Sequence, residues 1–262
     1  MELGIQGKRA LVTGGAQGIG KAIVKGLEKA GAKVAFTSRN GQYVNDLLGE
    51  LERPGDHFGI EIDLVPEEGP TLLKQRIDAK FGNIDIVVNN IGDTLGILDP
   101  FCPLADWRKV YRLNLEVHVE VVNLFIPHML KQKWGRIINI TAGASMENSG
   151  PVPYCTMKAA YTAYTRSMGR VLAPKNIVMS AVLPGVVLTE NGHWNKVLQE
   201  RPEHAERYLQ ERTVLKRFGK PEEISPMVIL LCSELASFCQ GAIIPVEGGQ
   251  ARHYFHVHGV GN

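Results

Sequence analysis

Several features are missing from the sequence, and each absence excludes a class of protein. No apolar stretch reaches the ~18 residues that a membrane helix needs, and the first ten residues lack the apolar centre of a signal peptide. The four cysteines form no CxxC pair and no zinc-ligand spacing, so we expect no metal site and a reduced, cytoplasmic setting. Basic residues number 29 against 27 acids, with no basic run of five, so we expect no nucleic-acid partner.

Strand-like and helix-like patterns alternate along most of the 262 residues. The apolar runs predict strands at 8–13, 33–37, 58–63, 85–89, 136–141, 177–183 and 242–246. Helical periodicity covers 18–30, 41–52, 67–81, 105–132, 154–173, 195–212 and 221–236. This alternation predicts an α/β Rossmann fold, a doubly wound seven-stranded parallel sheet with helices on both faces. Its ligand crevice should lie at the carboxyl ends of the strands.

No linker rich in Pro, Gly or Ser divides the chain, so we expect residues 1–262 to form a single domain. The polar segment at about 186–216 is predicted to form a substrate lid. Within it, Asn191, His193 and Trp194 are candidates for substrate contacts. The tail at about 250–262 carries three histidines but no carboxylate or cysteine that would complete a metal site, so we expect it to pack on a neighbouring subunit.

A glycine-rich turn links the first predicted strand to the first predicted helix. It contains Gly14, Gln17, Gly18, Ile19 and Gly20. Glycines let the backbone turn sharply and approach a ligand, and the free N–H groups of the following helix attract an anion. The turn therefore predicts a pyrophosphate site. A nucleotide-binding P-loop is the alternative, but Ala22 stands where that motif needs a hydroxyl for Mg²⁺.

The end of the second predicted strand indicates which dinucleotide is bound. NAD-binding enzymes commonly place a carboxylate there for the ribose 2′-hydroxyl, whereas this chain has Ser38 followed by Arg39. A guanidinium beside a small hydroxyl suits a 2′-phosphate. We therefore expect NADP(H) to be preferred, with NAD(H) possible.

Tyr154 and Lys158 stand four residues apart at the start of a predicted helix, so both side chains share one face. A free phenol has a pKa of about 10 and is a poor base at neutral pH. A nearby ammonium group would favour the phenolate. The pair is therefore a candidate for moving the proton of an alcohol while hydride moves to or from nicotinamide.

Six motifs occur in the order and spacing of the short-chain dehydrogenase/reductase superfamily, which the chain resembles over about residues 5–250. They are Thr13-Gly14-x3-Gly18-x-Gly20, Asp63, Asn89-Asn90-Ile91-Gly92, Asn114, Tyr154-x3-Lys158 and Pro184-Gly185-x3-Thr189. Two further segments, Arg217–Glu223 and Glu247–Gly249, resemble the branch of 3-oxoacyl-[acyl-carrier-protein] reductases.

The resemblance implies roles for individual residues. Tyr154 would be the proton donor or acceptor, Lys158 would hold the ribose, and Asn114 would anchor a water that connects Lys158 to solvent. The cofactor would also contact Asp63, Leu64, Asn89, Asn90, Gly92, Pro184, Gly185 and Thr189. A homotetramer, or a dimer, is implied as well, with helices 105–132 and 154–173 in the subunit contact.

One position departs from the family pattern. The family places a serine just after the fifth strand, about 13 residues before the tyrosine, to bind the substrate carbonyl. Counting back from Tyr154 gives Thr141, whereas aligning the end of the strand gives Ala142, which has no hydroxyl. Thr141 and Ser145 are both candidates for the missing group, with Ser145 slightly favoured. Met146, Glu147 and Asn148 are expected to form the opposite wall of the pocket.

These observations lead to an expected function, an NADP(H)-dependent oxidoreductase that interconverts a ketone and a secondary alcohol. The substrate would be a 3-oxoacyl thioester or a polar hydroxylated ketone. Two alternatives remain: a lyase or epimerase of the same fold that uses transient oxidation, and a cofactor-binding regulator without catalysis.

Overall fold

The computed structural model describes residues 2–250, so most of the histidine-containing tail lies outside the described residues. The sheet has seven strands in the order β3-β2-β1-β4-β5-β6-β7, and all neighbouring pairs are parallel. Their bounds are β1 Arg9–Val12, β2 Lys33–Ser38, β3 Phe58–Glu61, β4 Ile86–Asn89, β5 Gly135–Ile140, β6 Ile177–Pro184 and β7 Ile243–Val246. The predicted doubly wound parallel sheet is therefore confirmed.

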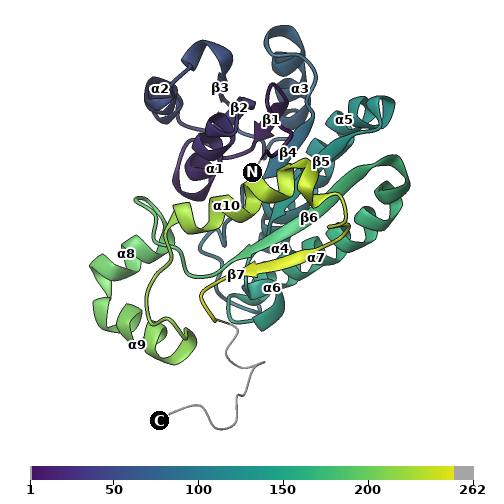
Figure 1. Cartoon of the computed structure of the whole chain (residues 1–262). Coiled ribbons are helices and arrows are strands. Elements are labelled where there is room, and N and C mark those ends of the chain that lie inside the picture. The colour runs from purple at the N-terminus through teal and green to yellow at the C-terminus, as the bar shows by residue number, and fades with distance from the viewer. Residues whose placement is uncertain (1, 251–262) are drawn as a thin grey trace.

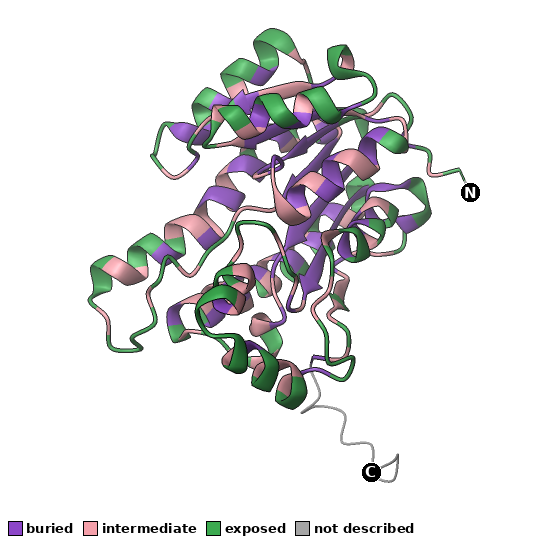
Figure 2. Cartoon of the chain, turned by 90° about the vertical axis from the view of Figure 1, so that its left-hand side faces the viewer, coloured by how far each residue is buried: buried purple, intermediate pink, exposed green. Residues whose placement is uncertain are grey.

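Helices cover both faces of this sheet (Figure 1). On one face pack α1 (Gly18–Lys29), α2 (Gly41–Glu50) and α10 (Pro221–Cys232). On the other pack α3 (Gly69–Lys80), α5 (Val117–Gln132) and α7 (Val152–Leu172). Two apolar clusters fill the spaces between the layers, and Figure 2 shows burial concentrated on the strands and on the inner sides of the helices. Burial on both faces explains why the central strands read as unbroken apolar runs.

The remaining helices lie near the carboxyl ends of the strands or on the connections between them. They are α4 (Leu104–Tyr111), α6 (Ala144–Glu147), α8 (His193–Glu200), α9 (Pro202–Arg212) and the short turns η1 (Pro54–Asp56), η3 (Ala173–Lys175) and η4 (Glu234–Ala236). Helices α8 and α9 stand apart from the sheet in Figure 1, within the segment predicted to be a lid.

Three predicted helices are wrong as continuous elements. The segment 105–132 is divided by η2 (Arg112–Glu116), a π-helical turn between α4 and α5. The segment 195–212 is two helices, because Pro202 has no N–H and disfavours helical geometry at Arg201, whose φ and ψ are −147° and 63°. The segment 221–236 ends as a helix at Cys232, where Ser233 is extended and caps the separate turn η4.

Residues 2–250 contain neither a membrane-spanning helix nor a cluster of metal-ligating side chains. No helix in this part of the chain combines the length and the hydropathy needed to cross a bilayer. Within the same residues, no group of three or more His, Cys, Asp or Glu side chains is arranged to hold a metal ion. All four cysteines are free thiols.

Candidate active site

Two cavities meet at the carboxyl end of the sheet. The first encloses about 770 Å³ and lies along the ends of β1, β2, β3 and β4. The second encloses about 930 Å³ and lies between the end of β5, the start of α7 and the helices α8 and α9. Gly92 and Asp93, which follow β4, line both cavities. The site is therefore a long cleft with two compartments that share one wall.

The glycine turn forms one end of the first cavity. Gly14 and Gln17 line it, and Gly14 (φ +62°) and Gly18 (φ +51°) adopt left-handed backbone conformations that favour glycine. A Cβ on Gly20 would overlap the carbonyl oxygen of Gly14 and lie 2.7 Å from Nδ2 of Asn90. Gly18, Ile19 and Gly20 begin α1 but are not among the residues that line the two cavities. The turn thus leaves room for a pyrophosphate at the amino end of α1.

Ser38 and Arg39, at the end of β2, line the same cavity, as do Asp63 and Leu64 after β3. Arg39 is exposed, and the Ser38 hydroxyl accepts a hydrogen bond from the backbone N–H of Asn40 at 3.1 Å. The structure therefore brings these four predicted residues to one end of the compartment. A guanidinium and a small hydroxyl side by side are chemically suited to a 2′-phosphate, so the residues that line this compartment fit NADP(H).

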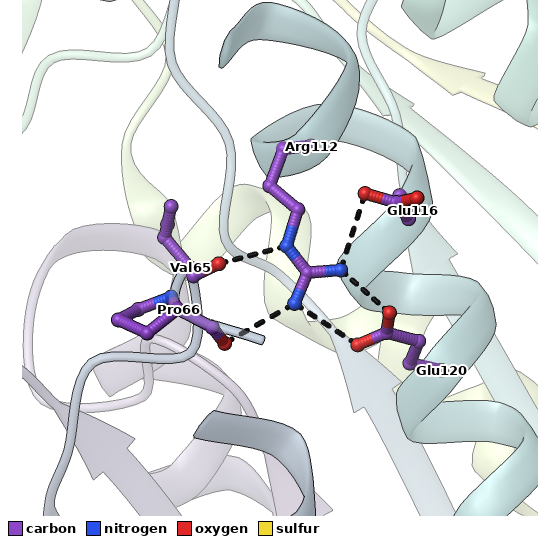
Figure 3. A network of polar contacts seen from close by, with 5 residues as sticks. All are labelled: Val65, Pro66, Arg112, Glu116 and Glu120. Carbon is purple, nitrogen blue, oxygen red and sulfur yellow. Dashed lines mark hydrogen bonds and ion pairs between the residues drawn. The ribbon is translucent and has the colours of Figure 1, made fainter. Parts of the chain in front are cut away.

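A side chain that the sequence reasoning missed holds the loop after β3 in place. Arg112 donates from Nε to the carbonyl oxygen of Val65 at 2.7 Å and from Nη2 to that of Pro66 at 3.2 Å (Figure 3). Its guanidinium is fixed in turn by Glu120, at 2.6 and 3.0 Å, and by Glu116 at 3.2 Å. Hydrogen bonding to Glu120 raises the pKa of Arg112, whose side chain is 13% exposed. Arg112 also lines the first cavity.

The two asparagines after β4 have different roles. Asn90 lines the first cavity, and its Nδ2 donates to the carbonyl oxygen of Gly14 at 3.0 Å. Asn89, which the family resemblance places beside the cofactor, is fully buried and donates to Oδ1 of Asn139 at 3.1 Å. Oδ1 of Asn139 also accepts a hydrogen bond from the Tyr161 hydroxyl at 2.7 Å. Asn89 therefore belongs to a polar network in the core, and Asn90 connects β4 to the glycine turn.

Tyr154 and Lys158 lie on α7 at the junction of the compartments. Tyr154 lines the second cavity, and Nζ of Lys158 lies 5.7 Å from the centre of its ring. Lys158 is 2% exposed and donates to the carbonyl oxygen of Ile140 at 3.3 Å. A Cβ on Gly92 would lie 2.7 Å from Nζ of Lys158. Glycine at position 92 thus leaves the ammonium directly beneath the wall shared by the two cavities.

The electrostatics of this pair differ from the expectation. Burial, followed by the nearby Asp93 and Cys155, raises the pKa of Tyr154 above its usual value. Burial also lowers the pKa of Lys158 to about 8. The predicted acidification of the phenol by Lys158 is not seen in this state, because desolvation disfavours the charged form of both groups. Tyr154 is therefore protonated at neutral pH and able to donate a proton.

Asn114 lies in the π-helical turn η2 and is fully buried. Its Nδ2 donates to the carbonyl oxygens of Asp93 at 2.8 Å and Val110 at 3.0 Å, and its Oδ1 accepts from the Asp93 N–H at 3.2 Å. A Cβ on Gly92 would lie 3.0 Å from the same Oδ1. Asn114 thus joins the helix to the loop that carries the shared wall, close to Lys158. Single π-turns of this kind are frequent at functional sites.

The segment after β6 closes the cleft from the other side. Pro184 and Gly185 line the second cavity. Thr189 lies against the glycine turn, since a Cβ on Gly18 would come within 2.9 Å of its Cγ2. Asn191, His193 and Trp194 line the second cavity, as the sequence predicts for substrate contacts.

Neither of the two hydroxyl residues predicted to bind the substrate carbonyl lines the second cavity. Ala142, at the end of β5, lines the second cavity, whereas Thr141 and Ser145 are not among its lining residues. Thr141 is 4% exposed, and the Oγ atoms of Thr141 and Ser145 are buried without a hydrogen-bond partner among the described residues. The expected wall of Met146, Glu147 and Asn148 is instead formed by Ser149, Gly150 and Pro151. Met146 and Glu147 belong to the short helix α6, and Asn148 follows it in a left-handed conformation.

Similarity to known proteins shows the family to which the chain belongs. The sequence model of the short chain dehydrogenase family matches residues 8–197. The chain belongs to this family. As a short-chain dehydrogenase it is similar to the 3-oxoacyl-[acyl-carrier-protein] reductase FabG of Aquifex aeolicus (strain VF5). The two are 38% identical over 252 residues, which cover 95% of this chain and 99% of the relative.

Solved short-chain dehydrogenases share the fold over nearly the whole chain. The crystal structure of L-sorbose reductase from Gluconobacter frateurii, complexed with NADPH and L-sorbose, superposes with a TM-score of 0.87 and 27% identity, covering 95% of this chain and 98% of that one. A 7α-hydroxysteroid dehydrogenase complexed with NADH and 7-oxo glycochenodeoxycholic acid gives a TM-score of 0.86 and 32% identity, covering 95% and 96%. This chain is accordingly an oxidoreductase of the same architecture.

Proposed function

We propose that this short-chain dehydrogenase is an NADP(H)-dependent ketoreductase that interconverts a polar ketone and its secondary alcohol, with Tyr154 as the acid and base. The observation that carries the proposal is the position of Tyr154. Its side chain faces the second cavity close to the wall, Gly92 and Asp93, that this cavity shares with the first. A carbonyl held beside Tyr154 is thus next to the end of a dinucleotide that lies along the first cavity.

Tyr154 and Lys158 divide the proton chemistry between them. When bound, the reduced nicotinamide supplies a hydride, with its electron pair, to the carbonyl carbon. The Tyr154 hydroxyl gives its proton to the carbonyl oxygen, so that C=O becomes CH–OH. Burial dominates the Tyr154 pKa in the free enzyme, and we expect the buried cation Lys158 to offset the negative charge of the phenolate once the proton has left. Asn114 is anchored beside the same wall by its bonds to Asp93, and we expect it to hold a water that returns the proton.

NADP(H) is favoured by the charges along the first cavity. Arg39, Arg108 and Lys109 line it together with Arg112. The L-sorbose reductase structure contains NADPH, and the 7α-hydroxysteroid dehydrogenase structure contains NADH. The shared fold therefore does not determine which dinucleotide is bound, and the residues that line the first cavity must decide it. Ser38 and Arg39 suit the charged 2′-phosphate better than a free hydroxyl.

A polar ketone is favoured by the lining of the second cavity. His193, His204, Arg207 and Glu211 of the two lid helices face it, together with Asp93. The polar side chains of this cavity can form hydrogen bonds with hydroxyl or carboxyl groups of a substrate. An apolar acyl chain in the same place would leave these side chains without hydrogen-bond partners. A panel of hydroxylated ketones and 3-oxoacyl thioesters, each with NADPH and NADH, tests this. Faster turnover of the thioesters would overturn the polar-ketone assignment.

The decisive test of the function replaces Tyr154 with phenylalanine. We expect the loss of the NADPH absorbance change at 340 nm with every ketone, while NADPH fluorescence shows unchanged binding. Retained ketone reduction would contradict the proposed mechanism. Turnover by the native enzyme without net change at 340 nm would instead indicate a lyase or epimerase, and binding without any turnover would indicate a regulator.

We also propose that the enzyme is a homotetramer in the cytoplasm. Apolar side chains are exposed within segments 105–132 and 154–173, where the family resemblance implies subunit contacts. They include Tyr111 (38% exposed), Leu130 (40%) and Val171 (65%). Covering such residues in a subunit interface removes apolar surface from water. Light scattering of the purified protein should give four times the mass of one chain, and a monomer would contradict the proposal.

A further inference from the structure

The buried ammonium of Lys158 receives little hydrogen bonding from the protein. Its side chain is 2% exposed, and Nζ donates to the carbonyl oxygen of Ile140 at 3.3 Å. Within residues 2–250 this is its one hydrogen bond, and no carboxylate forms an ion pair with it. An ammonium has three donors, and a buried charge is costly unless other groups stabilise it. Another feature of the fold must therefore support the cation.

Two aromatic rings of α7 provide that support. Nζ of Lys158 lies 5.7 Å from the centre of the Tyr154 ring and 5.9 Å from the centre of the Tyr161 ring. A cation over the face of a ring within about 6 Å is attracted by the ring's negative face, and more strongly where water is excluded. Tyr154 changes its protonation state during the proposed reaction. Tyr161 is fully buried, and burial raises its pKa well above the usual value, so it stays neutral throughout.

The Tyr161 ring is fixed from two directions. Its hydroxyl donates to Oδ1 of Asn139 on β5 at 2.7 Å, and Nδ2 of Asn139 donates to Oγ1 of Thr165 at 2.9 Å. Its ring stacks on the imidazole of His118 on α5, with centres 4.7 Å apart and planes 8° apart. The ring therefore cannot turn away from Lys158 without breaking a buried hydrogen bond and a buried ring contact.

Four titratable groups surround the ammonium of Lys158. Tyr154 and Tyr161 come from α7, and His118 comes from α5. Burial, followed by the charge of Lys158, lowers the pKa of His118, so its imidazole is neutral and adds no competing positive charge. Asp93, after β4, follows Gly92, at which a Cβ would lie 2.7 Å from Nζ. Tyr161 is thus a permanently uncharged support on a face of the ammonium away from the reacting atoms.

We propose that Tyr161 is a positioning residue, whose ring holds the ammonium of Lys158 in place and keeps it charged beside Tyr154. The contact itself is independent of the reaction, but its catalytic consequence rests on the proposed ketoreductase function. Reduction of a ketone leaves a phenolate at Tyr154, so the rate depends on the charged form of Lys158.

The first test is the pH dependence of kcat/KM for NADPH, which reports groups of the free enzyme. Tyr161→Leu removes the ring, whereas Tyr161→Phe keeps it and loses only the hydroxyl. The pKa of Lys158 is about 8, and losing a desolvated cation–π contact should lower it by about one unit. We therefore expect Tyr161→Leu to be about fivefold slower than the native enzyme at pH 8 and within about twofold at pH 6. Tyr161→Phe should follow the native profile. An equal loss at both pH values, or the same displacement in Tyr161→Phe, would overturn the proposal.

The second test needs neither cofactor nor turnover. Because the pKa of Lys158 is lower in the folded chain than in the unfolded chain, the unfolded chain binds the extra proton, and stability rises with pH across this window. In Tyr161→Leu the window should begin about one pH unit lower. Urea titrations at fixed protein concentration should then show a steeper rise in stability between pH 7 and 8 than in the native enzyme or Tyr161→Phe. The rise should be native in the control Tyr164→Leu, which removes a ring 6.2 Å from that of Tyr161 on the same helix.

A background without the ammonium completes the comparison. In Lys158→Met, adding Tyr161→Leu should leave the pH slope of stability unchanged. Equal slopes for Tyr161→Leu and the native enzyme would refute the ring–ammonium contact, even if Tyr154→Phe proves inactive as the function requires. If the native enzyme reduces no ketone, the function fails, and the slopes still test the contact. Should Tyr161→Leu not fold, a ring-fluorinated phenylalanine at position 161 replaces it, since fluorine keeps the ring's shape and weakens its negative face. Its slope should be steeper than that of Tyr161→Phe, and equal slopes would refute the proposal.

Discussion

Replacing Arg112 with methionine should weaken NADPH binding and leave the chemical step nearly unchanged. Methionine has a similar length but no donors, so the loop after β3 loses its hydrogen bonds at the carbonyls of Val65 and Pro66. Glu116 and Glu120 lose their common partner at the same time. Asp63 and Leu64, which line the first cavity, belong to the same loop. Tyr154 and Lys158 lie on α7 and are not held by Arg112.

The size of the effect follows from the two bonds to the loop. A hydrogen bond from a charged donor contributes about 1.5–3 kcal/mol when buried. The Arg112 side chain is 13% exposed, so water replaces part of this, and we take roughly 1–3 kcal/mol for the pair. If the free enzyme must then order the loop before binding, the Kd for NADPH rises by about 5- to 140-fold, since each 1.4 kcal/mol is a factor of ten.

The assay is a fluorescence titration with NADPH, followed by kcat at saturating cofactor. We expect Arg112→Met to raise Kd and to keep kcat within about threefold, whereas Lys29→Met, an exposed cation at the end of α1, should change neither. Arg112→Lys should be intermediate, because an ammonium cannot bridge both carbonyls and a bidentate carboxylate together. A Kd equal to that of the native enzyme in Arg112→Met would show that the loop keeps its shape without the arginine.

Three other predictions concern single residues. Arg39→Asp should lower kcat/KM measured with NADPH relative to kcat/KM measured with NADH. If the native enzyme has the same kcat/KM with both cofactors, Arg39 does not have the proposed role. Gly20→Ala should destabilise the fold by about 1–3 kcal/mol in urea titrations, because its methyl would overlap the Gly14 carbonyl; an unchanged midpoint would refute this. His118 is fully buried, and burial, followed by the charge of Lys158, lowers its pKa. Since the unfolded chain then binds a proton that the folded one does not, stability should fall as pH drops below about 6.5. His118→Leu should flatten that slope between pH 5 and 6.5, and an identical slope would argue against a neutral His118.

The arrangement of the fold could be predicted because its signals are local. Runs such as Ile86–Val88 are apolar throughout, as strands buried on both faces require, and the strand bounds agree within about two residues. The positions of Gly14, Tyr154 and Lys158 also follow from spacing, because a strand-to-helix turn and an i, i+4 pair fix where side chains lie. The π-turn at Asn114 gives no such signal, and the sequence pattern runs through it as one helix.

The remainder of the site depends on contacts between distant segments. Arg112 holds a loop 46 residues away in sequence, and nothing near it in the chain predicts that partner. Ser149 and Ser145 are both serines after β5, and only the path of α6 determines that one faces the cavity while the other is buried. The raised pKa of Tyr154 likewise results from burial, which spacing does not reveal.

The two-compartment cleft separates cofactor recognition and substrate choice along the chain. The glycine turn and the ends of β2 and β3, all before residue 70, line the compartment in which we propose that the dinucleotide lies, whereas α8 and α9 supply much of the lining of the other compartment. Pro202 divides the two helices, and they pack beyond the sheet rather than within its core. Exchange of residues 193–212 for those of another family member should therefore redirect the enzyme to new ketones while its coenzyme specificity is inherited unchanged.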